Sequence, residues 1–268
     1  MSEARESSAR QPFDLLIEEA GESGCLAHIP TLPGFCFRAE TVAEAEASAP
    51  GRIAEYVAWL RAERLTDLTA DTARAAREGG DVRVVIAECV RGAPVWESGN
   101  AATLFDADHL PLDDVEIVAR LRFVRRVLEG IREAAAPLSA SARAHRPAPN
   151  RRSIDETLEH IGNCIWWYCS RIDDDLPEPE EPPGEDPLAR IDRLFGIAEA
   201  YLLTVPFAER TRIRVPTRFP TKDPNERWTH TKVCRRQAEH VWAHLPGLES
   251  AEEALDARVG EEKRDRAA

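Results

Sequence analysis

The chain has 268 residues, of which 43% are hydrophobic and 31% charged, a composition typical of a folded globular protein. Its net charge of −13 disfavours nucleic acid as a partner, because duplex binding requires a basic face. The polar stretch 1–11 has no apolar leader segment, and no later run is long enough to cross a membrane, so we expect a cytoplasmic protein without a membrane partner.

The first hundred residues alternate between strand and helix signals, which predicts a small α/β domain over residues 1–98. A helix is expected from Thr41, where Glu44 completes a capping box and its carboxylate can reach back to the cap amide. Pro50-Gly51 interrupts that helix and is expected to split it. A short helix over 65–77 should end at Gly79-Gly80. The expected strands are 13–18, 25–29, 35–39 and 81–89.

His28 lies on the second expected strand, where the apolar residues Cys25, Ala27 and Ile29 point to the opposite face. This alternation predicts that His28 is a surface residue. The chain has six cysteines but no CxxC pair, which disfavours a zinc ribbon and a redox dithiol. We expect most of them to be thiols packed in the core.

The run GCLAHIPTLPGF at 24–35 resembles the Pro-x-Leu-Pro-Gly signature of HicB-like antitoxins, and the helix start AETVAEA at 39–45 is also similar to that family. The resemblance covers residues 12–62. It implies a small sheet with a helix on one face, used as a binding scaffold. The DNA-binding element of family antitoxins does not carry over, because a different sequence follows.

Apolar periodicity and capping signals in the second half predict four long helices. We therefore expect an α-helical bundle over residues 112–248 and an α+β fold overall. The first helix should open at 111–114, with an apolar stripe of Val115, Val118, Leu121, Val124 or Arg125, and Leu128. The other three are expected over 153–173, 188–204 and 227–245, the last ending at Pro246-Gly247. Between them we expect a linker over 143–150 and a disordered acidic loop over 176–187. The charged tail 249–268 is expected to be frayed helix or disordered.

Histidines at i and i+4 of the last helix, His240 and His244, lie one turn apart on the same side. They are displaced by about 110° from the apolar stripe of that helix, and His160 lies beside the stripe of the second helix. The three imidazoles are therefore expected at the rim of a cleft between two helices, where they could hold one divalent metal ion. Solvated or hydrogen-bonded histidines are the alternative for each residue taken alone.

Residues 112–248 resemble the DinB-like superfamily, in the SIDETLEHI run at 153–161 and the RQAEHVWAHL run at 236–245. The resemblance implies a four-helix bundle in which His160, His240 and His244 bind a divalent ion such as zinc or nickel. It further implies a metal-dependent transferase acting with a low-molecular-weight thiol, or a hydrolase. The chain departs from the family pattern at Val241, where a glutamate would follow the first histidine of the pair.

Three histidine ligands leave coordination positions open for water or substrate, as in catalytic zinc sites, and a bound metal could lower the pKa of water or of a thiol. Cys164 is either a fourth ligand or a packing residue. Glu156 either accepts a hydrogen bond that orients the His160 ring or acts only in the capping box of the helix. The aromatic run 166–168 is expected to pack in the core rather than stack on a ligand, and His230 is expected to be exposed.

The sequence thus supports a metal-dependent enzyme acting on a small molecule, and, as the alternative, a non-catalytic interaction protein related to HicB-type antitoxins. A homodimer is compatible with either, and an antitoxin role ranks third. No G-x-S-x-G elbow, Walker loop or dinucleotide fingerprint is present, which disfavours serine-hydrolase and nucleotide chemistry.

Overall fold

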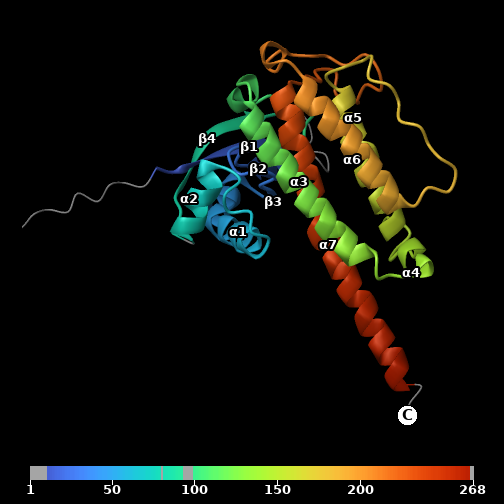
Figure 1. Cartoon of the computed structure of the whole chain (residues 1–268). Helices are drawn as coiled ribbons and strands as arrows, with labels where there is room; N and C mark the ends of the chain where they lie inside the picture. Colours follow the sequence, from blue (N-terminus) through green and yellow to red (C-terminus); the bar gives the residue numbers. More distant parts are fainter. Residues whose placement is uncertain (1–10, 80, 93–98, 266–268) are drawn as a thin grey trace, which may run out of the picture.

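The computed structural model describes residues 11–79, 81–92 and 99–265, with side chains described as far as residue 248. The fold is mixed α+β: the four strands and two helices come first, followed by a helical second half (Figure 1). The strands are β1 (Phe13–Glu19), β2 (Cys25–His28), β3 (Cys36–Ala39) and β4 (Val84–Arg91). The helices are α1 (Val42–Ala62), α2 (Ala70–Glu78), α3 (Asp114–Ala135), α4 (Ala140–Ala144), α5 (Ile154–Ser170), α6 (Pro187–Thr204) and α7 (His230–Asp265).

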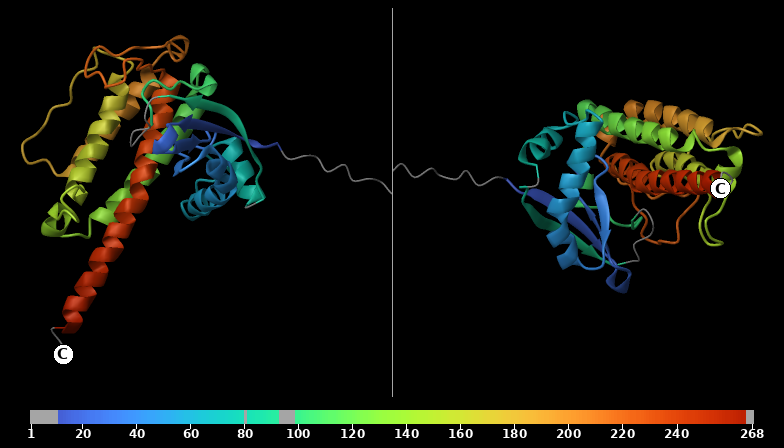
Figure 2. Two further views of the ribbon diagram at one scale, coloured as in Figure 1. Left: turned by 180° about the vertical axis from the view of Figure 1, so that it is seen from behind. Right: turned by 90° about the horizontal axis from the view of Figure 1, so that it is seen from below.

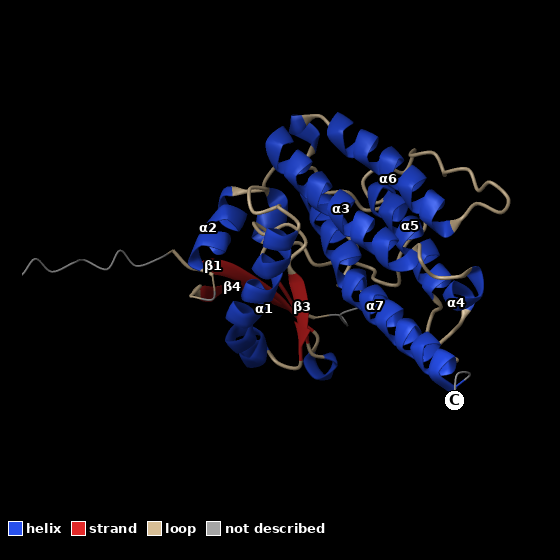
Figure 3. Ribbon diagram, turned by 60° about the horizontal axis from the view of Figure 1, so that its bottom comes forward, coloured by secondary structure: helices blue, strands red, loops and turns tan. Residues whose placement is uncertain are grey.

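The four strands form one sheet in the order β3-β2-β1-β4, with β4 parallel to β1 and the other neighbours antiparallel. Helix α1 contacts all four strands and buries Ile53, Tyr56 and Val57. Helix α7 contacts β3, so the helices of the second half reach the sheet as well (Figure 3). All four residues of the central strand β2 are buried.

The start of α1 follows the predicted chemistry, but the helix is not split. The Thr41 side chain accepts a hydrogen bond from the Glu44 amide, whereas the Glu44 carboxylate accepts one from the Glu40 amide rather than from the cap residue itself. Pro50 lies inside the continuous helix. The predicted break at Pro50-Gly51 is therefore wrong: burial of Ile53, Tyr56 and Val57 against the sheet holds the helix together across the proline.

The long helices pack pairwise, α3 against α7 and α5 against α6, with further contacts from α5 to α7 and from α3 to α6. Figure 2 shows these four helices lying beside one another, with the C-terminal part of α7 extending beyond them. On α5 the predicted apolar stripe is buried, from Ile154 through Ile165 to Ile172 just past the helix end. On α3 the predicted stripe is only partly right, because Val115 and Val118 are exposed and the buried face centres on Ile117, Phe123 and Val127.

The structure differs from expectation in two segments that connect the long helices and in the bounds of the last helix. The short helix α4 lies where only a linker was expected to begin. The acidic stretch 176–186 has no helix or strand, but it is placed: Leu176 is buried, and Glu185 pairs with Arg193. Helix α7 begins at His230 and continues through Pro246-Gly247 to Asp265, so the predicted stop there is wrong and the charged tail is helical as far as Asp265.

Within the described ranges, no helix is both long and apolar enough to cross a membrane. The polar stretch 1–10 and the expected domain boundary at residue 98 lie outside the described residues.

Candidate metal centre

Two helices supply the three histidines, and local sequence fixes where the first of them starts. Ser153 caps α5 by accepting from the Glu156 amide, while the Glu156 carboxylate accepts from the Ser153 amide. This reciprocal capping box, predicted from the sequence, is confirmed. It sets the helical register that places His160 on the side of α5 that faces α7.

The structure brings His160, His240 and His244 together. One nitrogen from each ring can be chosen so that the three atoms lie within 4.8 Å of one another, which is close enough for a single ion. The ring centroids are 4.7 Å apart between His240 and His244, and 5.0 and 5.3 Å apart between His160 and these two rings. The rings meet at steep angles rather than stacking face to face.

His240 lies deeper than the sequence predicted. Its side chain is only 4% exposed, whereas His160 and His244 are half-buried. The expectation that all three line a rim is therefore wrong for His240, because the tight packing of α7 against α3 and α5 encloses this part of the helix. The cluster thus has one buried member and two members that face a more open side.

The buried Nε2 atom of His240 has no hydrogen-bond partner among the described residues. Burial, followed by the nearby charges of His244, His160, Arg236 and Arg152, lowers the pKa of His240 well below its usual value. The imidazole is therefore neutral at pH 7, the form that coordinates metals. A buried ring nitrogen without a hydrogen-bond partner costs free energy, and a metal ion would satisfy it in the tautomer that leaves Nε2 unprotonated. The donor set thus fits a divalent ion.

Cys164 and Glu156, the two additional candidates, lie close to His160 in sequence but differ in their surroundings. The Cys164 sulfur lies 3.6 Å from Nδ1 of His160, so it remains either a neighbour or a fourth ligand. The Glu156 carboxylate serves the helix cap and pairs with Arg146. Its capping role is confirmed, and its role in orienting His160 remains a prediction.

The aromatic run 166–168 contributes both to the core and to the surroundings of the histidines. Tyr168 is buried, as expected for a core residue, but its ring centroid also lies 5.8 Å from that of His240. Trp167 packs edge-on against Trp228, on the other side of Tyr168. One member of the run therefore forms part of the wall around the histidines.

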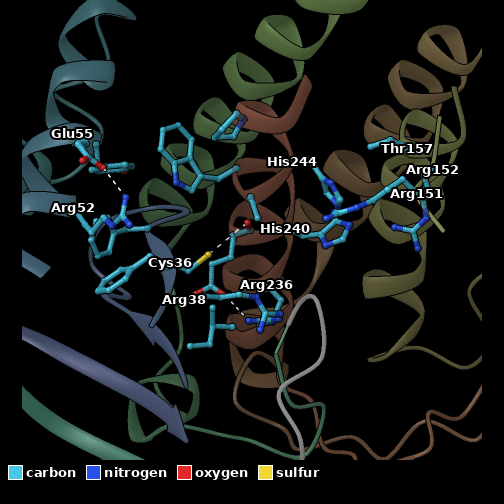
Figure 4. A pocket seen from close by; sticks show the side chains of 18 of the residues that line it. Cys36, Arg38, Arg52, Glu55, Arg151, Arg152, Thr157, Arg236, His240 and His244 are labelled. Atoms are coloured by element: carbon cyan, nitrogen blue, oxygen red, sulfur yellow. Dashed lines mark hydrogen bonds and ion pairs between the residues drawn. The ribbon is translucent and has the colours of Figure 1, made fainter. Parts of the chain in front are cut away.

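A cavity of about 1020 Å³ opens onto His240 and His244. One of its walls comes from the sheet and α1, and the other from α7 and the segment that precedes α5. Figure 4 shows the two histidines on the α7 wall, on the side of Arg151 and Arg152. The cluster therefore has space for a small molecule beside His240 and His244.

No protein-family model matches this chain, and no curated protein or solved structure matches it either. The site is thus described by its own geometry: three imidazoles from two helices around a point that a small molecule can reach.

A group of ionised side chains next to the histidines was missed in the sequence. This buried ion cluster consists of Glu18, His28, Asp108, Arg235, Arg236 and Glu239. Arg235 pairs with Asp108 at 2.7 Å and with Glu239 at 3.1 Å. Glu239 accepts from Nδ1 of His28 at 2.8 Å, and Glu18 lies 3.5 Å from Nε2 of the same ring. The cluster thereby joins the sheet to α7, one residue before His240.

His28 is at the centre of this cluster, and its predicted surface position is wrong. The side chain is 0% exposed, and the Phe105 ring lies 5.5 Å away. Burial lowers the pKa of His28, but the charge of Glu239, the hydrogen bond to Glu239 and the nearby Glu18 carboxylate outweigh it, so the pKa is raised. Burial likewise raises the pKa of Glu18, but His28 outweighs it and holds that pKa at about 2. The cluster therefore places the His28 ring between two carboxylates inside the protein.

His230 is also buried rather than exposed, at the start of α7. Its Nε2 lies 3.0 Å from the carbonyl oxygen of Leu202, to which it donates. Burial lowers the pKa of His230 to about 4, and the hydrogen bond offsets this only in part. His230 is thus a neutral core residue that links α7 to α6.

Proposed function

We propose that this chain binds one divalent metal ion through His160, His240 and His244 and uses it in a reaction of a small molecule. The observation that carries the proposal is the convergence of three imidazole nitrogens within 4.8 Å, one of which belongs to a buried ring whose Nε2 has no other hydrogen-bond partner among the described residues. Imidazole ligands suit zinc and nickel, so these are the metals we propose.

We further propose that α3, α5, α6 and α7 form a four-helix bundle of the DinB-like kind and that the preceding strands and helices form a HicB-like module. The pairwise contacts of the four helices support the first assignment. The antiparallel β1, β2 and β3 covered by α1 support the second. On this reading the metal ligands come from two helices that face each other inside the bundle, the usual source of bundle metal sites.

The residues present would hold the ion on the protein side and leave its remaining positions facing the cavity. A divalent ion bound there would supply a Lewis acid that lowers the pKa of a small thiol. The chain's own contribution is to fix the three imidazoles: His240 by burial, and His160 by the capped register of α5. The proposed reaction class is transfer of a low-molecular-weight thiol, or hydrolysis.

Zinc titration of protein stripped of metal tests this proposal. Wild-type protein should bind one equivalent, and the double variant His240→Ala/His244→Ala should bind none at this site. His145→Ala, which removes an exposed histidine elsewhere in the chain, is the matched control and should bind as the wild type does. Stripped wild-type protein that takes up neither zinc nor nickel would overturn the proposal and leave the non-catalytic interaction protein as the better account.

A further inference from the structure

The cavity beside the histidines is built jointly by the two halves of the chain. Phe37 of β3 lines one side, whereas His240, Trp242 and His244 of α7 line the other. Its volume of about 1020 Å³ lies at the upper end of the roughly 300–1,000 Å³ of small-molecule sites. The space can therefore hold an organic molecule much larger than a simple ion.

The charged groups of this cavity are largely paired within the protein. Arg52 pairs with Glu55 at 3.2 Å, and Arg236 pairs with Glu239 at 2.8 Å. Two further arginines of the lining also have interaction partners, namely Arg38 and Arg152. The apolar part of the lining is therefore the surface that a ligand would cover.

This apolar part is a row of aromatic rings. Phe37 packs edge-on against Phe35, with ring centroids 5.7 Å apart, and Phe35 packs in the same way against Tyr56 at 5.5 Å. Tyr56 meets Trp242 at 5.6 Å, so the row runs from the sheet to α7. Phe35 and Tyr56 are buried, whereas Phe37 and Trp242 are half-buried. Phe37 and Trp242 are therefore the rings whose surfaces a ligand can reach.

Trp242 lies on the side of α7 away from the histidines. Each residue of a helix advances by about 100°, so Trp242 is about 160° from His240. The contacts agree, because the Trp242 ring lies 4.8 Å from Trp59 of α1, whereas the His240 ring lies 5.0 Å from His160 of α5. Figure 4 likewise shows the histidines and Cys36 of β3 on opposite sides of α7. A helix with its side chains is roughly 10–12 Å across, so a molecule that touches both sides must be about 10 Å long.

Ala243 lies between these two sides, on the face of α7 that lines the cavity. By the same helical arithmetic it is about 60° from His240 and about 100° from Trp242. Its side chain is small and exposed, so it leaves a path across the helix from the histidines to the aromatic rings. A bulkier side chain at this position would narrow that path.

We propose that the cavity binds an elongated small molecule with an aromatic ring at the end remote from its reacting atom. The ring lies against Phe37 and Trp242, the chain crosses α7 over Ala243, and the reacting atom lies at His240 and His244. Edge-to-face contacts favour an aromatic group over an aliphatic one of similar size. The inference rests on the proposed function, because it names the substrate class of the proposed metal centre. It also gives the N-terminal part of the chain a role, because β3 supplies one of the two rings.

Titration of metal-free, full-length protein tests the aromatic wall separately from the metal. 6-Phenylhexanol should bind at least about tenfold more tightly than hexanol, and more tightly than 6-cyclohexylhexanol, measured as Kd by ligand-observed NMR. Phe37→Ala should remove most of the gain from the phenyl group. Phe207→Ala, which removes an exposed ring outside the cavity, is the matched control and should bind as the wild type does. The proposal fails if 6-phenylhexanol binds no more tightly than either other alcohol, or if Phe37→Ala leaves its gain unchanged.

Thiols of two lengths, added to zinc-loaded protein, test whether one molecule reaches both ends of the cavity. 6-Phenylhexanethiol should bind at least about tenfold more tightly than hexanethiol. 2-Phenylethanethiol should gain less than about threefold over ethanethiol, because its ring is too close to the sulfur to reach Trp242. Ala243→Leu changes an exposed residue, so it should fold and take up zinc, but it should lose most of the long-chain gain. An undiminished gain in this variant, or an equal gain for both lengths, would contradict the path across α7.

The two experiments separate this inference from the proposed function. Protein that takes up no zinc but keeps a Phe37-dependent preference for 6-phenylhexanol would count against the metal centre and leave the aromatic site standing. Protein that binds zinc and simple thiols but gains nothing from the phenyl group would do the reverse.

Discussion

Among the described residues, His28 is the only one of the sheet that is hydrogen-bonded to the buried Glu239 carboxylate of α7. Replacing it therefore tests this link between the sheet and the helix. His28→Leu removes a charged donor lying 2.8 Å from Glu239 and 3.5 Å from Glu18, and leaves both carboxylates buried. Removing one partner of a buried ion pair costs about 3–5 kcal/mol. Glu239 keeps its arginines, so most of this loss comes from Glu18, which among the described residues then keeps the hydrogen bond from the Asn100 amide. His28→Gln, which can still donate one hydrogen bond, should cost about 1–3 kcal/mol.

Urea unfolding followed by circular dichroism at pH 6 measures these losses, and Arg212→Ala, which breaks an exposed pair, should cost less than about 1 kcal/mol. The pH dependence has a definite sign. Because the pKa of His28 is raised in the folded protein, its contribution is complete below the unfolded pKa of about 6.5 and is lost as the pH rises through the folded value. The difference between wild type and His28→Leu should therefore shrink at alkaline pH. A loss below about 1 kcal/mol at pH 6, or one that grows with pH, would refute the reasoning.

Three further changes test other parts of the fold. His230→Gln should reduce the loss of unfolding free energy between pH 6.5 and 4.5, because His230 takes up a proton in this range only in the unfolded chain; its pKa in the folded protein is about 4. The full effect is about 3 kcal/mol. An unchanged pH dependence of the unfolding free energy, measured in urea, would contradict it. Gly34→Ala should lower the melting temperature by several degrees in calorimetry, because the added Cβ would lie 2.1 Å from the Phe123 ring and because Gly34 has a φ of +77°. Gly51→Ala is the control: no atom lies within 4 Å of its added Cβ, so it should not lower the melting temperature. Ser153→Ala should cost about 1 kcal/mol through loss of the α5 cap, measured by urea unfolding, and a neutral result would show that the cap is dispensable.

Local signals in the sequence predicted most elements of the fold, and the failures share one physical cause. Capping at Thr41 and Ser153, the strand expected from residue 25 and the helix expected over 188–204 are all seen in the structure. Pro50 and Pro246 were expected to end their helices but lie inside them. A proline removes one hydrogen bond at a known cost, but packing on either side of it depends on distant residues that no local pattern reveals.

His28 shows the same limit more sharply. Its position opposite Cys25 and Ala27 was predicted correctly from the alternation of the strand, and the register of β2 with β1 places it beside Leu16, on the same face as Glu18. The conclusion that this face is solvated was wrong, because α7 and the segment around Phe105 cover it. The carboxylates that stabilise the buried histidine come from positions 18 and 239, and nothing in the sequence near residue 28 indicates them.

The histidine cluster was predictable because its geometry is mostly local. The spacing of His240 and His244 fixes their separation on any helix, and only the approach of α5 had to come from the tertiary fold. The depth of His240 was not predictable, since it depends on how closely α7 packs against α3 and α5. The cavity was not predictable either, because its lining residues Arg38 and Arg152 lie more than a hundred residues apart in sequence.

Elemental analysis of the purified full-length protein tests the central claim most directly. The account predicts about one equivalent of zinc or nickel per chain, lost in His240→Ala/His244→Ala and retained in His145→Ala. Wild-type protein that contains no divalent metal and takes up none when zinc or nickel is added would contradict it.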